Sequence, residues 1–128
     1  MESLKAYLMS FALGAVIYGL IEVIVRGYTH WTMALAGGLV MVIFYYIGAR
    51  TNLGLLGRCL VGALVITAIE FTIGMIVNRG LGWNVWDYSD RPFNILGQIC
   101  PKFTVGWFFL SIPAFFVTDR LREYFSLR

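Results

Sequence analysis

Four long apolar stretches constrain the fold of this 128-residue chain more than any other feature. They cover residues 4–25, 31–49, 55–77 and 104–117. A single helix needs roughly 20 apolar residues to cross a bilayer, and only the last stretch is clearly shorter. Only 13% of the residues are charged, which excludes an ordinary soluble domain. We therefore predict an all-α, polytopic membrane protein with four transmembrane helices, and we expect residues 1–128 to form one transmembrane domain.

Basic residues give the expected orientation. Four crossings place both termini on one side of the membrane, and that side carries six of the ten basic residues. These six are Lys5, Arg50, Arg58, Arg120, Arg122 and Arg128, and the other four are Arg26, Arg79, Arg91 and Lys102. We expect a bacterial cytoplasmic membrane protein with both termini in the cytoplasm, although so small an excess leaves dual topology open. The lipid bilayer explains the net charge of +3, so we expect no nucleic-acid partner.

Small and polar residues recur at helical spacing in two of the stretches. In the third stretch they are Ala63, Thr67, Glu70, Gly74 and Asn78. In the first they are Ser10, Gly14, Tyr18, Glu22 and Arg26. Each set lies on one side of its helix, and Ala34 with Gly38 gives the second helix a further small surface. We predict that these surfaces face protein rather than lipid, because small residues let helices approach closely.

Glu70 is the ionisable residue that most needs an explanation. It lies 12 residues after Arg58 and 8 before Asn78, which places it well inside the hydrocarbon at about 1.5 Å per residue. A charge there costs roughly 2.5–3.5 kcal/mol, so Glu70 must be protonated, paired or facing a wet cavity. A binding function and a packing role both remain open. Glu22 is a weaker candidate, because Arg26 at i+4 offers it an ordinary ion pair at the helix end.

Residues 79–102 fit neither a solvated loop nor a spanning helix. They are rich in Trp, Phe, Ile and Leu, yet glycine and proline interrupt them repeatedly. We predict an interfacial or re-entrant segment before the last helix. Its aromatic residues suit headgroup depth, but that role does not explain the polar residues among them. The candidate binding residues are Asn78, Arg79, Trp86, Asp87, Tyr88, Asp90 and Asn94, and Asp90 also suits a capped turn.

No enzyme or cofactor motif accompanies these residues. A phosphate-binding loop is missing, so an ATP-driven role would need a partner ATPase. The single histidine, His30, has no serine, cysteine or acid beside it. We expect no cofactor, no resident metal and no catalytic residue. Convergence of Glu70, Asp87 and Asp90 on a lipid headgroup would instead make a lipid-modifying carboxylate enzyme, which we keep as a weaker alternative.

The second half of the chain resembles a known family. The residues that carry the resemblance are Ile69-Glu70-Phe71, Asn78-Arg79-Gly80, Trp86-Asp87-Tyr88-Ser89-Asp90, Pro92-Phe93-Asn94, Gly97, Ile99-Cys100 and Trp107. They are similar to the signature of the CmpB-like small membrane proteins labelled ABC-transporter type IV, in a short form. The resemblance covers about residues 62–121, and Tyr18-Gly19 to Glu22 resembles a helix of the same family. A longer Asn-Arg-Gly-Phe and Gly-Pro-x-x-Pro-x-Tyr-Gly segment of many bacterial members is absent, so no role of that segment is carried over.

The resemblance implies a part in transport. We interpret the chain as a channel or transporter subunit for a small, cationic solute, acting as a homo-oligomer or with a partner transporter subunit or ATPase. Glu70 and Glu22 would line the pathway, and the aromatic and acidic segment would cover one end of it. The alternative is a non-catalytic membrane scaffold or partner-binding protein.

Overall fold

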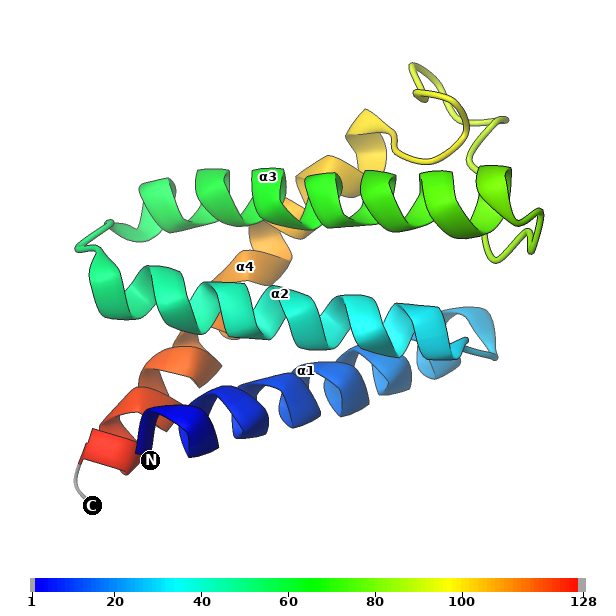
Figure 1. The fold of residues 1–128 in the computed structure, drawn as a ribbon. Coiled ribbons are helices and arrows are strands. Elements are labelled where there is room, and N and C mark those ends of the chain that lie inside the picture. The colour runs from blue at the N-terminus through cyan, green and yellow to red at the C-terminus, as the bar shows by residue number, and fades with distance from the viewer. Residues whose placement is uncertain (1, 127–128) are drawn as a thin grey trace. The chain divides into compact units, whose positions relative to one another are not determined.

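The computed structural model describes residues 2–126, with side chains from Leu4 onward, and consists of helices joined by short connections and one longer segment. The helices are α1 (Glu2–Arg26), α2 (Trp31–Arg50), α3 (Leu55–Gly74) with the π-helical turn η1 (Met75–Gly80), and α4 (Pro101–Ser126) (Figure 1). Four helices, α3 being counted together with η1, are long and apolar enough to cross a membrane. The predicted all-α, polytopic membrane fold is therefore confirmed.

The last helix is longer than its apolar stretch. It runs from Pro101 to Ser126, whereas the sequence predicted only residues 104–117. The final turns are polar and are supported by ion pairs at i,i+3 spacing, which a hydropathy argument does not detect. These pairs join Arg122 to Asp119 and Arg120 to Glu123. Pro113 lies inside α4, and the helix continues through it rather than starting again there.

The described residues divide into two compact units. The first contains α1, α2 and the part of α4 from Ile112 onward, and the second contains Leu55–Ser111. The second unit therefore comprises α3, η1, the segment 81–100 and the first part of α4.

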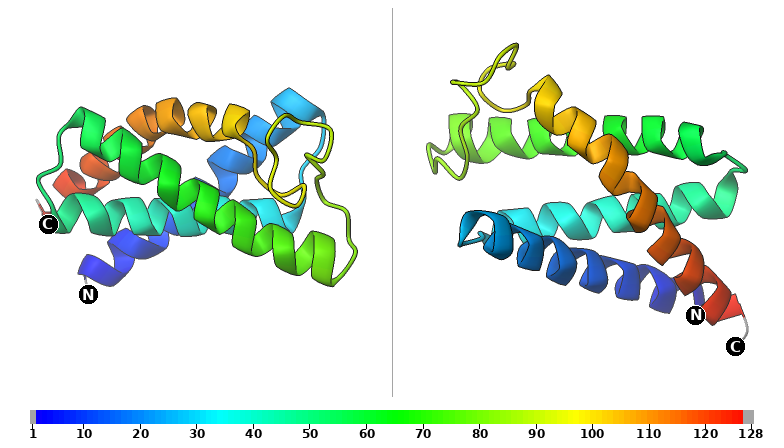
Figure 2. Two further views of the ribbon diagram at one scale, coloured as in Figure 1. Left: turned by 90° about the horizontal axis from the view of Figure 1, so that it is seen from above. Right: turned by 180° about the vertical axis from the view of Figure 1, so that it is seen from behind.

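In the first unit, α1 and α2 approach closely at paired glycines. A Cβ added to Gly14 would collide with the carbonyl oxygen of Gly37, and the reverse also holds. Gly38 lies in the same way against the ring of Phe11. Figure 2 shows the two helices side by side. Ser10 and Glu22 on the same side of α1 are buried, which confirms that this surface of α1 faces protein.

The C-terminal part of α4 packs on α2 within the same unit. The rings of Phe44 and Phe115 are stacked, with centroids 4.2 Å apart and planes 5° apart, and both side chains are buried. Arg122 holds the next residue of α2, because its guanidinium lies over the ring of Tyr45 and donates to the Tyr45 carbonyl oxygen. The last turns of α4 also share an apolar groove with Met9 of α1.

In the second unit, the segment 81–100 lies beside the last turns of α3 rather than beyond its end (Figures 1 and 2). It contains no helix, and an isolated bridge between Ile95 and Ile99 is its main regular feature. The segment then leads into α4 at Pro101, a residue well suited to a first helical position. The sequence predicted that this segment does not form a spanning helix, which is confirmed, and its interfacial or re-entrant depth stays a prediction.

Candidate functional site

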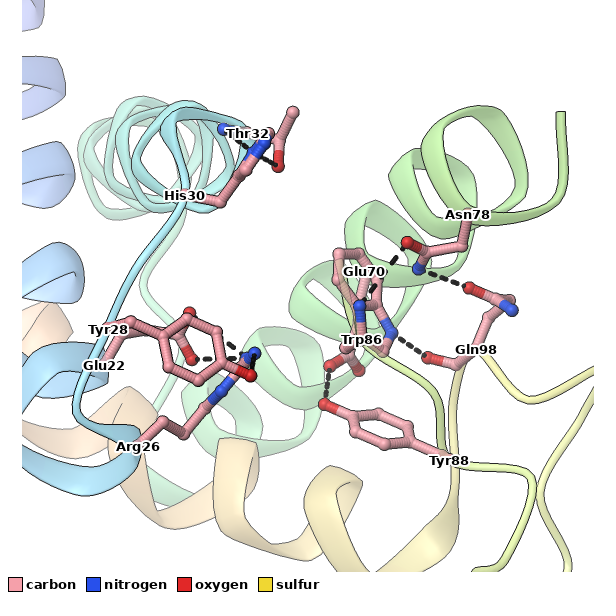
Figure 3. A network of polar contacts seen from close by, with 10 residues as sticks. All are labelled: Glu22, Arg26, Tyr28, His30, Thr32, Glu70, Asn78, Trp86, Tyr88 and Gln98. Carbon is pink, nitrogen blue, oxygen red and sulfur yellow. Dashed lines mark hydrogen bonds and ion pairs between the residues drawn. The ribbon is translucent and has the colours of Figure 1, made fainter. Parts of the chain in front are cut away.

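Glu70 is held by two hydrogen-bond donors from outside its own helix. Its Oε2 accepts a hydrogen bond from the Tyr88 hydroxyl at 2.8 Å, and its Oε1 accepts one from the Trp107 indole N–H at 3.1 Å. The Glu70 residue is only 6% exposed. Figure 3 shows the Tyr88 side chain reaching the carboxylate from the segment 81–100. The Glu70 carboxylate therefore joins three parts of the second unit: α3, the segment and α4.

Aromatic rings form one wall of this site. The Tyr88 ring is stacked on Phe103 with centroids 4.7 Å apart, and the Phe103 and Trp107 centroids are 6.4 Å apart. The guanidinium of Arg91 lies over the Phe103 ring, 5.5 Å from its centroid. Aromatic faces attract cations through the ring quadrupole. The structure thus combines a carboxylate with three aromatic rings, one of which already lies against an organic cation.

A second polar contact, here called the Asn78–Gln98 clasp, holds the segment against the end of α3. The Asn78 Nδ2 donates to Gln98 Oε1 at 2.8 Å, and Asn78 Oδ1 accepts from the backbone N–H of Val85 at 2.6 Å. The Trp86 indole N–H donates to the Gln98 carbonyl oxygen (Figure 3). A Cβ on Gly74 would collide with Gln98 and Trp86, so the close approach requires glycine there. The clasp fixes the segment that carries Tyr88.

The predicted small and polar surface of α3 faces these contacts. Glu70, Gly74 and Asn78 of this surface make the contacts described above. Thr67, on the same surface, forms a hydrogen bond of 2.9 Å with Thr104 of α4. On the opposite side of the helix Thr72 is exposed. The prediction that this surface faces protein rather than lipid is confirmed. The π-helical turn that contains Asn78 is an irregularity often found at functional sites.

The two acids of the segment lie apart from the Glu70 contacts. Asp87 is exposed, and its Oδ1 accepts a hydrogen bond from the Ser89 backbone N–H at 2.9 Å. This bond, supported by the Ser89 side chain, lowers the pKa of Asp87 below its usual value of 3.8. Asp90 is exposed and lies 4.0 Å from Arg91. Asp87 rather than Asp90 therefore caps the turn, and the imagined convergence of both acids with Glu70 does not occur.

Two other candidate binding residues, Asn94 and Arg79, make no contact with Glu70 in any hydrogen bond described here. Asn94 donates to the carbonyl oxygens of Ser89 and Arg91 and accepts from the Gly97 N–H, so its amide closes the turn. Arg79 is exposed at the end of η1. No group of three His, Cys, Asp or Glu side chains that could hold a metal occurs within residues 2–126.

Glu22 belongs to the first unit and has its own local partner. Arg26 lies one turn later, with 3.1 Å between the guanidinium and the carboxylate. The same guanidinium donates to the Tyr28 hydroxyl at 2.7 Å, and the Tyr28 ring lies against it. This is the i,i+4 ion pair expected at the end of α1.

A family model described as "Putative ABC-transporter type IV" matches residues 3–127. The chain belongs to this family. The match also covers the first two helices, so the range 62–121 inferred from the sequence was too narrow. No solved structure matches the chain.

Sequence reasoning missed several contacts of this candidate site. Phe103 lies four residues before Trp107, which only the family resemblance had marked, and this spacing could have indicated a shared aromatic surface on α4. Thr104 was missed as the partner of Thr67. Nothing in the sequence marks Gln98, because its role depends on how the segment folds back on α3.

Proposed function

We propose that this protein is the membrane-spanning component of a transport system for a small organic cation. The family description, which names ABC transporters, supports a part in transport. One observation carries the proposal: a buried carboxylate within a membrane-spanning helix accepts hydrogen bonds from aromatic side chains of two other parts of the chain. Ionisable residues in such positions are usually functional, because they are costly to keep there.

The chemistry of the site favours a cation with an apolar surface. Glu70 supplies the negative charge, while the rings of Tyr88, Phe103 and Trp107 supply faces that attract ammonium or guanidinium groups. Arg91 over Phe103 illustrates that such a ring accommodates a guanidinium group. Because the Tyr88 hydroxyl lies directly on the carboxylate, a solute that takes the place of this hydroxyl requires the segment 81–100 to move.

The transport pathway requires more than one chain. Four helices of this length enclose little volume, so we propose that the pathway forms between copies of the chain or with a partner transporter subunit. The chain has no phosphate-binding loop, and energy from ATP would come from a partner ATPase. We place the protein in a bacterial cytoplasmic membrane with both termini in the cytoplasm, following the six-to-four distribution of basic residues.

A binding titration tests the role of Glu70. The purified protein in detergent is titrated with methylammonium and with methylguanidinium at millimolar concentrations, and tryptophan fluorescence is recorded because Trp107 contacts Glu70. We expect a saturable change that Glu70→Gln abolishes. The matched control is Glu123→Gln, an exposed acid paired with Arg120 at the end of α4, which should behave as wild type. A titration that is absent in wild type, or unchanged in Glu70→Gln, contradicts the proposal.

A membrane scaffold is the second candidate, and one observation favours it. Both oxygens of Glu70 already accept hydrogen bonds within the protein, as a carboxylate used only for packing would. A scaffold would show no cation titration, would co-purify with a defined membrane partner, and would lose that partner when Glu70→Gln loosens the segment. The titration therefore separates the two functions.

A further inference from the structure

The segment 81–100 holds three apolar side chains outward at its tip. Phe93 is 86% exposed, Ile95 53% and Leu96 49%, and we call these three residues the apolar tip. Phe93 and Leu96 have positive φ angles of 58° and 54°. Residues with side chains seldom adopt this conformation, so the turn is built in a specific and unusual way. The same turn that exposes the apolar tip is closed by the Asn94 amide.

The backbone around the apolar tip forms many hydrogen bonds within the segment. The backbone N–H of Tyr88 donates to the carbonyl oxygen of Gly97. In the same way, the N–H of Ile95 donates to Ile99, and the N–H of Gln98 donates to Ile95. Side-chain amides satisfy further carbonyl oxygens, including that of Leu96, which accepts from Gln98. A loop in water can leave such groups to the solvent, whereas a loop next to lipid must satisfy them internally. The hydrogen bonding therefore suits an apolar surrounding.

The position of the segment also points to lipid. It lies beside the last turns of α3, within the length of a membrane-spanning helix rather than beyond it (Figure 1). Two basic residues accompany the apolar tip: Arg91, whose side chain is 40% exposed, and Lys102, which is exposed at the start of α4. Basic residues near a membrane surface are attracted to anionic headgroups. Apolar side chains flanked by cations are typical of structures that lie in the membrane interface.

We propose that the apolar tip inserts sideways into the lipid bilayer at the level of the headgroup and acyl-chain boundary, with Arg91 and Lys102 among the headgroups. The occupant of this surface is phospholipid, not a second copy of the chain and not a partner subunit. Lipid contact at the apolar tip would hold the segment that carries Tyr88 at a fixed depth. The inference does not depend on which solute, if any, binds at Glu70.

Site-directed spin labelling tests the insertion. The full chain is placed in vesicles of phosphatidylethanolamine and phosphatidylglycerol, with Cys59→Ala and Cys100→Ala removing the two native thiols. A nitroxide is attached at Phe93→Cys and, as a matched control, at Asp90→Cys, whose side chain is 83% exposed in the same turn. We expect the label at 93 to be accessible to oxygen and protected from a water-soluble nickel complex, with an oxygen-to-nickel ratio severalfold higher than at 90. A label at 93 that is accessible to nickel, or shielded from both reagents, overturns the proposal.

Photocrosslinking identifies the occupant without a new thiol. Phe93 is replaced by p-benzoylphenylalanine, which keeps an aromatic ring at this position, and the vesicles are irradiated. Mass spectrometry should find phospholipid adducts at position 93 and few at position 90 when that residue is replaced in the same way. An adduct with a second chain or another protein, or no lipid adduct at 93, contradicts insertion into lipid.

Discussion

At the scale of single residues, the site depends on which donors reach a buried carboxylate. Glu70 could be selected from the sequence because its distance from both helix ends placed it inside the hydrocarbon. Its partners Tyr88 and Trp107 lie 18 and 37 positions away, and no local pattern predicts contacts at those separations. Tyr88 was a candidate for its chemistry alone, and Trp107 was known only from the family resemblance.

Removing one hydroxyl tests the Tyr88 contact. Tyr88→Phe keeps the ring on Phe103 but removes the donor to Glu70 Oε2. We expect the free energy of unfolding in detergent to fall by about 1–3 kcal/mol, because a buried acceptor loses a partner. Tyr46→Phe is the matched control, since Tyr46 is 51% exposed on α2. Equal effects of the two substitutions would contradict a specific role for the Tyr88 hydroxyl.

The Asp87 cap predicts a pH dependence with a definite sign. Hydrogen bonds from Ser89 lower the pKa of Asp87 below 3.8 in the folded protein, so the ionised form stabilises the fold. This stabilisation is fully present well above pH 3.8 and is lost as the pH falls through the lowered pKa. Asp87→Asn keeps an acceptor oxygen but does not titrate. The advantage of wild type over this variant in unfolding free energy should shrink as the pH falls through 3.8 and then through the lowered pKa, and a constant advantage would exclude the assignment.

At the scale of helices and the segment, regular periodicity was predictable and irregular chain was not. The surfaces of α1 and α3 that face protein follow from small residues at helical spacing, such as Gly14 and Gly74. The predicted C-terminal end of α4 was wrong, because the apolar stretch ends at residue 117 while ion pairs continue the helix to Ser126. The path of the segment depends on positive φ angles at non-glycine residues, including Asn84 and Phe93, and no sequence pattern predicts these angles.

The close approach of α1 and α2 can be tested with two alanines. In Gly14→Ala the added methyl group would collide with the Gly37 carbonyl and with Met41, so the helices must separate. We expect a loss of about 1–3 kcal/mol in unfolding free energy, the usual cost of overpacking. Gly19→Ala on the same helix meets nothing within 4 Å and should be neutral or slightly stabilising. If both variants unfolded alike, the glycine contact would not contribute to stability.

The Asn78–Gln98 clasp predicts a local effect on the segment. Asn78→Ala removes the acceptor of the Val85 N–H and the donor to Gln98. Hydrogen exchange should rise in residues 85–98 while the α1 and α2 amides stay protected, because the lost contacts lie within the second unit. Thr72→Ala is the control, since Thr72 is exposed and bonds only within α3. Faster exchange throughout the chain would indicate general unfolding instead.

At the scale of the whole molecule, the open properties are what this chain binds and how many copies act together. The family match over residues 3–127 extends across all four helices. The prediction of four spans followed from composition and length, since lipid leaves few alternatives to helices. The copy number, the partner and the solute depend on contacts between surfaces, and the sequence of one chain does not predict which surfaces make them.

Native mass spectrometry of the protein released from lipid tests whether Glu70 binds a solute. Wild type and Glu70→Gln are compared for copy number and for any retained small molecule or ion, with Glu123→Gln as the control. The account predicts an oligomer or partner complex that retains a small cationic ligand in wild type and in Glu123→Gln, and loses it in Glu70→Gln. An assembly that is empty in wild type, or that keeps the same ligand without Glu70, would contradict the assignment of Glu70 as a solute-binding residue.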